Sequence, residues 1–592
     1  MAPLSLLVAL TALTTGVISQ ATNGTILNPI LPGFHPDPSC IFVPEWNSTF
    51  FCATSSFNSF PGIPIHASKD LKIWSLIGHV LNRREQLPRL AETNRSTSGI
   101  WAPTLRYNKG TFWLVTTLVD DDRPQADSSR WDNIIFKGTD PYDAKSWSNA
   151  VHFEFEGYDT EPFWDVDGKV YITGAHAWQV GPYIQQAEAD LDTGKVGEWR
   201  TIWNGTGGMA PEGPHVYLKD GWYYLLAAEG GTGLGHMVTM ARSRNISGPY
   251  ESNPANPVLT NANTTSIFQT VGHADLFQDA SGNWWAVALS TRSGANYTNY
   301  PMGRETVLTS VSWPNASFPT FTPISGSIPA LLPQSTSSLP SSIPSIYPLV
   351  TTAEDLTFPL STPTLPPYFT HWRYPYPESY TLTSTSLRLH PSHLNLTALN
   401  GNYAGPLHFS PNSTAAKGQT FISRRQTSTL FTFAIDFHFT PDRANSEFGI
   451  SAFLTQNHHI DLGIVLLPRK MATDSFEGPD SRDPEELIPQ IRLRGMSYKT
   501  VPKDVVIPVP RVWIGGELCL EVRADDSKGY VFSVGPAKRP EMREVATWGN
   551  ELVSWGFTGV LLGAYATSNG GEGRAVGDIT RWRYVDRGQV RE

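Results

Sequence analysis

A hairpin pattern that recurs about every 60 residues is the feature that most limits how this chain can fold. Each copy has a short apolar strand, a polar turn that usually carries glycine, and a second strand rich in aromatic and branched residues. The copies occupy residues 40–54, 105–115, 163–172, 216–226 and 276–287. The intervals between them are 64, 58, 53 and 60 residues, counted from Ile41, Leu105, Phe163, Val216 and Leu276. Intervals of this length hold four strands each, so the repeat predicts a β-propeller with five blades.

Composition agrees with turn-rich β structure in more than one domain. The chain has 592 residues, which exceeds what one hydrophobic core usually organises. Charged residues make up 17% and aromatic residues 11%, and 49 glycines and 47 prolines supply turns, which excludes a long helical or disordered chain. The net charge of −10 and the pI of about 5.9 leave no basic surface for phosphates, so we expect no nucleic-acid partner.

The N-terminal segment 1–20 is typical of a secretory signal peptide. An apolar run from Leu4 to Ile18 ends in small and polar residues. No later apolar run is long enough to span a bilayer, so we expect a secreted, extracellular protein with no membrane partner. Ten Asn-x-Ser/Thr sequons agree with secretion and with a glycoprotein.

Three cysteines provide no zinc or redox spacing. Cys40 and Cys52 flank one predicted hairpin, so they lie roughly opposite each other. A cross-strand disulfide and two buried thiols are both compatible with that position. Cys519 lies in an apolar strand pattern and is predicted to be a core residue.

Acidic residues precede three of the five hairpins. The residues four positions before the five starting points are Asp37, Trp101, Asp159, Glu212 and Gly272. Equivalent positions of successive blades surround the axis of a propeller, so the three carboxylates are predicted to converge at one end of the central channel. Asp and Glu are also ordinary turn formers, but three acids in register favour a site.

Three convergent carboxylates suit glycoside hydrolysis. One carboxylic acid protonates the leaving oxygen, and a second carboxylate activates water or attacks carbon. A third acid nearby raises the pKa of the first by like charge and holds its orientation. The close-spaced oxygen ligands of a calcium loop are absent from the sequence.

At these residues the chain resembles glycoside hydrolase family 43. The motifs that carry the resemblance are NPILPGFHPDPS (28–39), GIWAP (99–103), YDTEPF (158–163), APEGPH (210–215), GHADLF (272–277) and GRET (303–306). The resemblance implies that Asp37 is the general base, that Glu212 is the general acid, and that Asp159 tunes the pKa of the acid and orients it. Family members invert the anomeric configuration, which requires about 6.5 to 9.5 Å between base and acid to admit water.

The same resemblance implies further residues around the sugar. Arg304 is expected to bind sugar hydroxyls, with an ion pair to Glu305 as the alternative. His273 is expected near the axis, where family members sometimes bind a cation, so a structural calcium is possible although no cofactor is required; a buried core histidine is the alternative. Phe34, His35 and Trp101 flank the base or share its register, and we expect them to wall the subsite of the terminal sugar.

Residues 21–323 are thus predicted to form the catalytic propeller, and 324–367, rich in proline, serine and threonine, the connection to a second domain. Strands with period-two alternation recur over 368–592 without intervening helices, which predicts a β-sandwich. Segments 421–426, 456–459 and 557–565 resemble the concanavalin-A-like jelly roll that follows the propeller in many family 43 enzymes. Such a domain often packs on the propeller rim and closes one side of the pocket, which favours removal of terminal sugars.

The expected activity is that of an inverting, exo-acting hydrolase that releases pentose from arabinoxylan. An α-L-arabinofuranosidase is favoured because segments 272–277, 283–285 and 301–306 resemble members of that type. A β-D-xylosidase acting on xylo-oligosaccharides is the first alternative, and a catalytically silent sugar-binding propeller is the second. A fructan hydrolase is excluded because its Asn-Asp-Pro-Asn, Arg-Asp-Pro and Glu-Cys motifs are absent.

Overall fold

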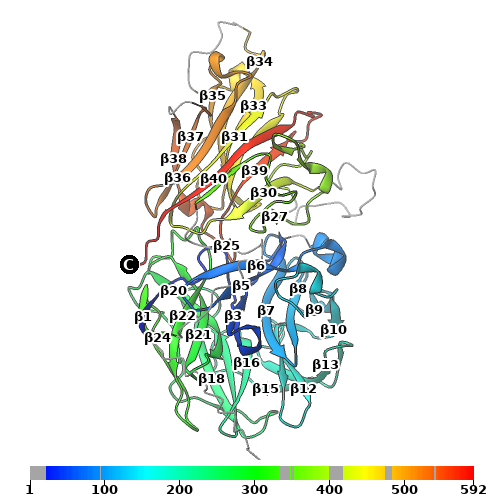
Figure 1. The fold of residues 1–592 in the computed structure, drawn as a ribbon, viewed down its shortest axis with the longest axis vertical. Coiled ribbons are helices and arrows are strands. Elements are labelled where there is room, and N and C mark those ends of the chain that lie inside the picture. Colours follow the sequence, from blue (N-terminus) through cyan, green and yellow to red (C-terminus); the bar gives the residue numbers. More distant parts are fainter. Residues whose placement is uncertain are drawn as a thin grey trace, which may run out of the picture.

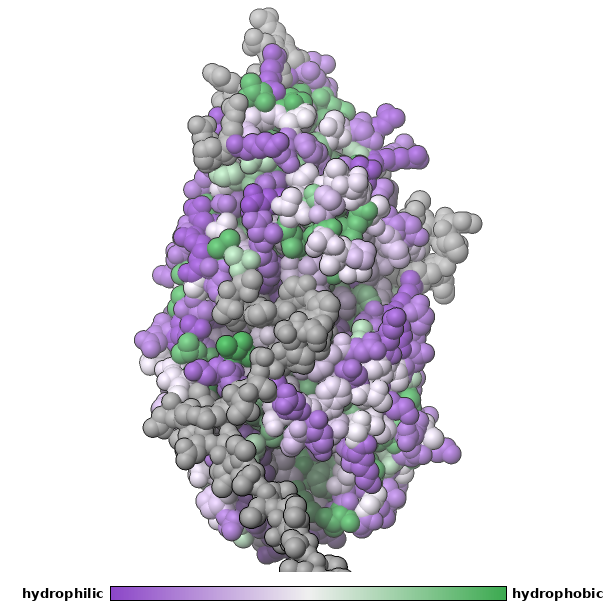
Figure 2. All heavy atoms as spheres, in the orientation of Figure 1, coloured by the Kyte–Doolittle hydropathy of each residue, from purple (hydrophilic) through white to green (hydrophobic). Residues whose placement is uncertain are grey.

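A computed structural model describes residues 22–93, 95–332, 347–348, 353–398, 418–473, 483–538 and 542–592. The predicted signal peptide and part of the predicted connection lie outside these residues. The described chain forms two all-β bodies, drawn one above the other in Figure 1, with the C-terminus at their junction. Hydrophilic side chains cover most of the face in Figure 2, and hydrophobic ones form only small groups there. Within the described ranges no helix is long and apolar enough to cross a membrane.

The lower body is a β-propeller. Five antiparallel sheets of four or five strands precede residue 333 in the described chain, apart from the short strand β25 (Tyr347–Pro348), which joins the first of them. Their strands follow one another in sequence:
β2 (Ser39–Val43), β3 (Thr49–Ala53), β5 (Gly62–Ser68) and β6 (Trp74–Leu81); β7 (Gly99–Asn108), β8 (Thr111–Val119), β9 (Trp131–Gly138) and β10 (Val151–Phe153); β11 (Gly157–Trp164), β12 (Val170–His176), β13 (Ile184–Asp190), β14 (Lys195–Val196) and β15 (Arg200–Trp203); β16 (Glu212–Lys219), β17 (Trp222–Glu229), β18 (Met237–Ser243) and β19 (Glu251–Ser252); β20 (Phe268–Gln278), β21 (Trp284–Arg292), β22 (Glu305–Ser312) and β23 (Thr320–Phe321). β1 (Thr22–Leu27) pairs with β24 (Ser327–Leu332), which joins the two ends of this body.

All five predicted hairpins are present, and in the first of them Cys40 and Cys52 lie directly opposite each other on β2 and β3. The structure joins these two cysteines in a disulfide. This resolves the choice left open by the sequence. Cys519 is a free, buried cysteine, as predicted.

The upper body is the predicted β-sandwich. One sheet contains β26 (Glu354–Thr357), β28 (Tyr380–Leu382), β29 (Leu387–Leu389), β31 (Leu430–Phe439), β36 (Leu518–Ala524), β37 (Gly529–Pro536), β38 (Arg543–Gly549) and β40 (Gly577–Gly588). The facing sheet contains β30 (Thr420–Arg425), β32 (Glu447–Thr455), β33 (His458–Pro468), β34 (Leu487–Met496), β35 (Val505–Pro508) and β39 (Leu561–Thr567). Alternating apolar residues of both sheets, such as Phe433, Ile450 and Leu520, form one buried core between them.

Regular helix in the described chain is limited to short 3-10 turns. They are η1 (Pro44–Trp46), η2 (Arg84–Gln86), η3 (Pro88–Glu92), η4 (Ser128–Arg130), η5 (Ala144–Ser146), η6 (Pro377–Ser379), η8 (Arg469–Met471), η9 (Arg511–Trp513) and η10 (Asn550–Val553). Several begin at proline, whose fixed φ suits the first helical position.

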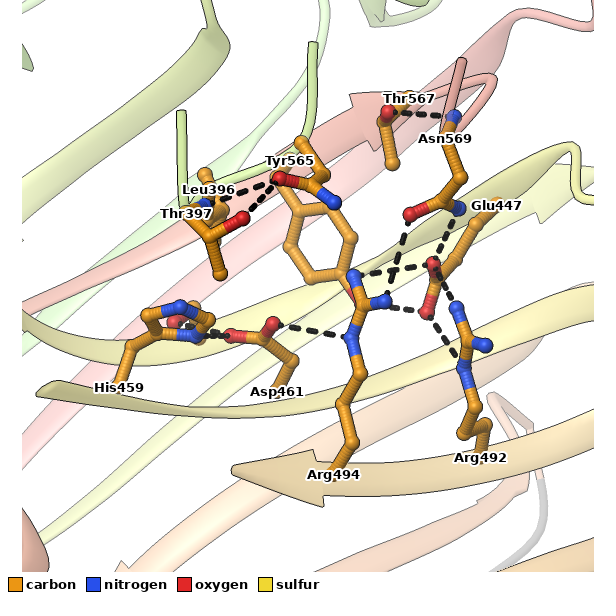
Figure 3. Close-up of polar contacts among 12 residues, drawn as sticks. Leu396, Thr397, Glu447, His459, Asp461, Arg492, Arg494, Tyr565, Thr567 and Asn569 are labelled. Carbon is orange, nitrogen blue, oxygen red and sulfur yellow. Dashed lines mark hydrogen bonds and ion pairs between the residues drawn. The ribbon is translucent and has the colours of Figure 1, made fainter. Parts of the chain in front are cut away.

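A buried ionic network ties strands of the six-stranded sheet together (Figure 3). Glu447 on β32 is 1% exposed and pairs with Arg492 and with Arg494, whose Nη2 lies 3.2 Å from Oε2. The Tyr565 hydroxyl of β39 also donates to Glu447, over 2.9 Å. Arg494 Nε lies 3.3 Å from the carboxylate of Asp461 on β33. Because each charge has an opposite partner, the network can stay buried without an unpaired ion.

Backbone contacts fix the sandwich on the propeller rim. β27 (His371–Trp372) of the upper body pairs with β4 (Ser59–Phe60) of the lower one. The Val560 amide donates to the Pro301 carbonyl over 2.8 Å. Gly303 has φ +69°, and a Cβ on it would lie 2.2 Å from the Thr558 carbonyl oxygen, so only glycine permits this approach. The loop before β39 is therefore held against the end of the propeller that carries the predicted site.

Candidate active site

A bulge in the first strand of four propeller sheets, and the turn before β2 in the fifth, decide which residues face the central pocket. β7, β11, β16 and β20 all carry a register shift near their start. Residues with positive φ mark the same place in each sheet: Asp37, Ala102, Asp159, Gly213 and His273. Glu212 lies one residue earlier than this set.

The prediction of three acids in one register is therefore wrong, although the acids do converge. The apolar residues used to align the hairpins do not all lie on the same face of their strands, and successive side chains point to opposite faces. Counting four positions back from the hairpin starts therefore selects Trp101, Glu212 and Gly272, which each lie one residue before the equivalent positions.

Asp37 is held by a fixed set of donors. It is 5% exposed and lies just before β2. Arg304 donates from Nη1 and Nη2 to its two carboxylate oxygens over 2.9 and 3.3 Å, and the Ser55 hydroxyl donates over 2.6 Å. Ser55 in turn accepts from the Ala102 amide over 2.7 Å. A two-pronged guanidinium contact fixes the orientation of a carboxylate.

Glu212, at the start of β16, is adapted to carry a proton. Burial raises the pKa of Glu212 to about 7, and the charge of Asp37 adds to this, while the hydrogen bond from Tyr158 opposes it. The Tyr158 hydroxyl donates to Oε2 over 3.0 Å. A carboxylic acid that remains protonated near neutral pH can act as a general acid.

Asp159, on β11, contacts the backbone that carries Glu212. Its Oδ2 accepts a hydrogen bond from the Gly213 amide over 3.0 Å. Burial raises the pKa of Asp159 well above its usual range, and the charges of Glu212 and Asp37 raise it further. Since like charges this close disfavour simultaneous ionisation, we infer that Asp159 and Glu212 titrate as a coupled pair.

His273 lies between the two aspartates. Its Nδ1 is 3.9 Å from one carboxylate oxygen of Asp37 and 3.9 Å from one of Asp159. Burial lowers the pKa of His273 to about 4, so the ring is neutral at neutral pH. A neutral imidazole can donate or accept a hydrogen bond here without adding charge to the pocket.

These groups line one small cavity with an empty volume of about 340 Å³. Its residues are Asp37, Phe57, Trp101, Tyr158, Asp159, Glu212, Thr232, His273, Arg304 and Phe557. Phe557 comes from the sandwich and stacks on Phe57 of the propeller, with ring centres 5.9 Å apart. Aromatic faces beside carboxyl groups suit a sugar ring, which has apolar faces and polar edges.

The structure brings together six of the eight residues expected at the site, namely Asp37, Trp101, Asp159, Glu212, His273 and Arg304. Phe34 and His35 do not line the cavity. Phe34 is fully buried among residues of both domains, and His35, 2% exposed, faces Thr54 with Nδ1 3.4 Å from its hydroxyl. Both precede the turn at Asp37, which directs their side chains into the core behind the pocket.

Four lining residues were not anticipated: Phe57, Tyr158, Thr232 and Phe557. Tyr158 directly precedes Asp159 in the motif YDTEPF (158–163), and Thr232 lies in the glycine-rich segment 230–235. Phe557 begins a segment that resembles the second domain. No motif in the sequence around Phe57 indicates that it lines the site.

A second polar layer lies two to four residues further along the same strands. Arg106 donates to Asp275 over 2.7 Å and to Glu161 over 2.8 Å, and its Nη2 lies 3.0 Å from His215 Nδ1. The Ser39 hydroxyl also donates to Asp275, over 2.7 Å. The Arg106 guanidinium therefore already pairs with both carboxylates of this layer.

These contacts bear on the possible calcium. In the described part of the chain no group of three or more His, Cys, Asp or Glu has the arrangement of a metal site. The carboxylates of Asp37, Glu161 and Asp275 are directed at arginines. Calcium takes six to eight oxygen ligands, water included, and the protein groups around His273 do not supply that number by themselves.

An all-β propeller whose small pocket holds three carboxyl groups, two with a raised pKa and one paired with an arginine, has the groups required for hydrolysis of glycosidic bonds. Comparison with known proteins agrees. Residues 26–319 match the model of glycosyl hydrolases family 43, and residues 360–585 match the β-xylosidase C-terminal concanavalin A-like domain.

Individual relatives match over most of the chain. A non-reducing end α-L-arabinofuranosidase of Bacteroides ovatus is 33% identical over 557 residues, which cover 92% of each chain. A β-xylosidase of Bacillus subtilis is 32% identical and covers 74% of this chain and 81% of its own. The crystal structure of a xylan β-1,4-xylosidase from Bacillus halodurans superposes with a TM-score of 0.78 at 25% identity, over 95% of this chain and all of that one. The protein belongs to glycoside hydrolase family 43 and is a glycoside hydrolase.

Proposed function

We propose that this enzyme is an inverting, exo-acting α-L-arabinofuranosidase that removes terminal arabinose from arabinoxylan. The observation that carries the proposal is the different environment of two carboxyl groups in one closed pocket. Asp37 is paired with Arg304 and Ser55, whereas Glu212 has its pKa raised to about 7. One group is thereby suited to accept a proton and the other to donate one.

In the proposed reaction Asp37 takes a proton from a water molecule. The water oxygen bonds to the anomeric carbon from one face of the sugar as the glycosidic carbon–oxygen bond breaks on the other. Glu212 gives its proton to the departing oxygen, and the configuration at the anomeric carbon is inverted. Asp159 holds the Gly213 amide and thereby the backbone position of the acid.

The exo mode agrees with the small size of the pocket and with its cover by the sandwich on one side. Phe557 of the sandwich packs on Phe57 and lies 5.0 Å from the Arg304 guanidinium, measured to its ring centre. Arg304 also donates to the Phe557 carbonyl over 3.1 Å. A pocket covered in this way admits the end of a glycan but not the middle of a chain.

The preference for arabinose rests on the Bacteroides ovatus relative, which is named as an arabinofuranosidase and aligns over 92% of both chains. A β-D-xylosidase acting on xylo-oligosaccharides is the second candidate, because the Bacillus subtilis relative is named as a β-xylosidase. The two pentoses present similar hydroxyls to the same small pocket.

Two further parts of the proposal concern architecture and location. We propose that the five sheets of the lower body are the five blades of the propeller. We also propose that the enzyme is secreted: the Cys40–Cys52 disulfide suits an oxidising compartment.

A proton NMR time course on arabinoxylan oligosaccharides tests the reaction. Release of arabinose with inverted initial configuration is expected. Xylose release would replace the first candidate by the second, and a retained anomer would refute the inverting mechanism.

Variants test the two roles. Asp37→Ala should abolish turnover of every substrate, and Glu212→Ala should abolish turnover of substrates with poor leaving groups while preserving binding. A wild-type rate in either variant would remove the assignment.

A further inference from the structure

A second cavity adjoins the active-site pocket at the junction of the two domains. Its empty volume is about 1000 Å³, on the same measure that gives 340 Å³ for the pocket. The propeller contributes Arg95 and Asp122 to its lining, and the sandwich contributes Asn457, Tyr498 and Trp555. We call it the junction cleft.

The junction cleft shares a wall with the pocket. Phe557 lines both cavities. The indole of Trp101, which lines the pocket, donates to the carbonyl of Thr97, which lines the cleft, over 2.9 Å. A glycan whose terminal sugar occupies the pocket therefore has the cleft beside its remaining residues.

Two aromatic side chains in the cleft are held in place before any ligand arrives. The Trp555 ring stacks on His458 with centres 4.9 Å apart, and it meets the Tyr498 ring edge to face at 5.5 Å. The Tyr498 hydroxyl accepts a hydrogen bond from Asn457 over 2.6 Å. Tyr498 is nevertheless 66% exposed, so its ring is accessible to a ligand in the cleft. Fixed aromatic surfaces bind with little loss of conformational entropy.

Each charged group of the cleft has an ionic partner: Arg95 pairs with Asp122 inside it, and Asp121 pairs with Arg130, which lies outside its lining. Arg95 Nε lies 3.4 Å from Asp122 Oδ1, and its Nη1 donates to the Asp121 carbonyl over 3.0 Å. The Arg95 and Asp122 side chains are 54% and 37% exposed, so both remain accessible. A compensated pair offers donors and acceptors to hydroxyl groups without a net charge, which favours a neutral ligand over an anionic one.

We propose that the junction cleft is the leaving-group subsite of this enzyme and binds the neutral xylopyranose chain beyond the scissile bond. Trp555 and Tyr498 contact the sugar rings, and Arg95, Asp122 and Asn457 bind their hydroxyls. This inference rests on the proposed function, because it assigns the leaving group of that same reaction. The sandwich domain thereby selects which glycans are hydrolysed, while the propeller performs the chemistry.

The test compares two substrates that carry the same terminal pentose and differ in the leaving group. In the first, the pentose is linked to methanol, which is too small to reach the cleft. In the second, it is linked to xylotriose. Trp555→Ala and Tyr498→Ala should each lower kcat/KM for the xylotriose substrate about tenfold. The methyl glycoside should be hydrolysed as by the wild type. Because Trp555 also packs against the sandwich core, the exposed Tyr498 provides a variant that should fold normally.

Trp178→Ala is the matched control, since this tryptophan is 37% exposed and lines neither cavity. It should change neither rate. Equal losses on both substrates, or no loss on xylotriose in the Tyr498 variant, would overturn the subsite. Wild-type enzyme that hydrolyses neither substrate would instead refute the proposed function, and the subsite with it.

Discussion

The hydrogen bond between Tyr158 and Glu212 sets how far the pKa of the proposed acid rises. It joins the phenol to Oε2 over 3.0 Å and stabilises the ionised form of Glu212, against the effects of burial and of Asp37. Tyr158→Phe removes this bond but retains the ring, which stacks on Trp131 at 5.4 Å and meets Trp101 at 5.9 Å. The variant should therefore keep the pocket wall and lose one stabilising contact of the carboxylate.

The magnitude follows from the strength of such a bond. A hydrogen bond to a charged group contributes about 1.5 kcal/mol, and 1.36 kcal/mol changes an ionisation equilibrium tenfold. The alkaline limb of the kcat/KM profile, which reports loss of the acid's proton, should therefore move up by about one pH unit. The wild-type limb is expected near pH 7.

The assay is hydrolysis of one oligosaccharide from pH 4 to pH 10. Tyr223→Phe is the matched control, because its hydroxyl bonds Asp165 over 2.8 Å and lies outside the pocket. Its profile should follow the wild type. An alkaline limb that stays in place or moves down in Tyr158→Phe would refute the role of Glu212 as the titrating acid.

Two further predictions concern stability. Glu447→Gln should lower the free energy of unfolding by about 3 kcal/mol, because it leaves Arg492 and Arg494 without their shared partner. Burial would raise the pKa of Glu447, but the charges of Arg494 and Arg492 hold it below its usual range. The wild type should thus lose stability as pH falls below about 4.3. The variant should lose less. If the free energies of unfolding of the two proteins, measured by denaturant, differed by the same amount from pH 3 to 7, this prediction would be wrong. Replacing Cys40 and Cys52 together by serine should cost roughly 3 kcal/mol, since their disulfide closes a short loop, and an unchanged melting temperature would disprove that contribution.

Local patterns in the sequence were enough to predict most strands of both domains. The hairpins from Ile41 to Val287 show apolar alternation and turn residues, and these act between neighbours in the chain. The period-two alternation noted over 368–592 corresponds to strands such as β31, β32 and β33. Asp37, Asp159 and Glu212 could be chosen as well, because each stands at a similar distance before a hairpin.

Tertiary structure alone decided how those acids are used. The bulges that turn Asp159 and His273 toward the pocket arise from pairing between strands, so hairpin alignment placed Glu212 one residue out of register. Phe557 contacts Phe57, 500 positions earlier in the chain, because the sandwich docks on the propeller rim at Gly303. The sequence alone determined the strands and the acidic residues, since alternation and turn chemistry are local. The closed pocket and the pKa of its acid depend on burial, which exists only after distant surfaces have packed together.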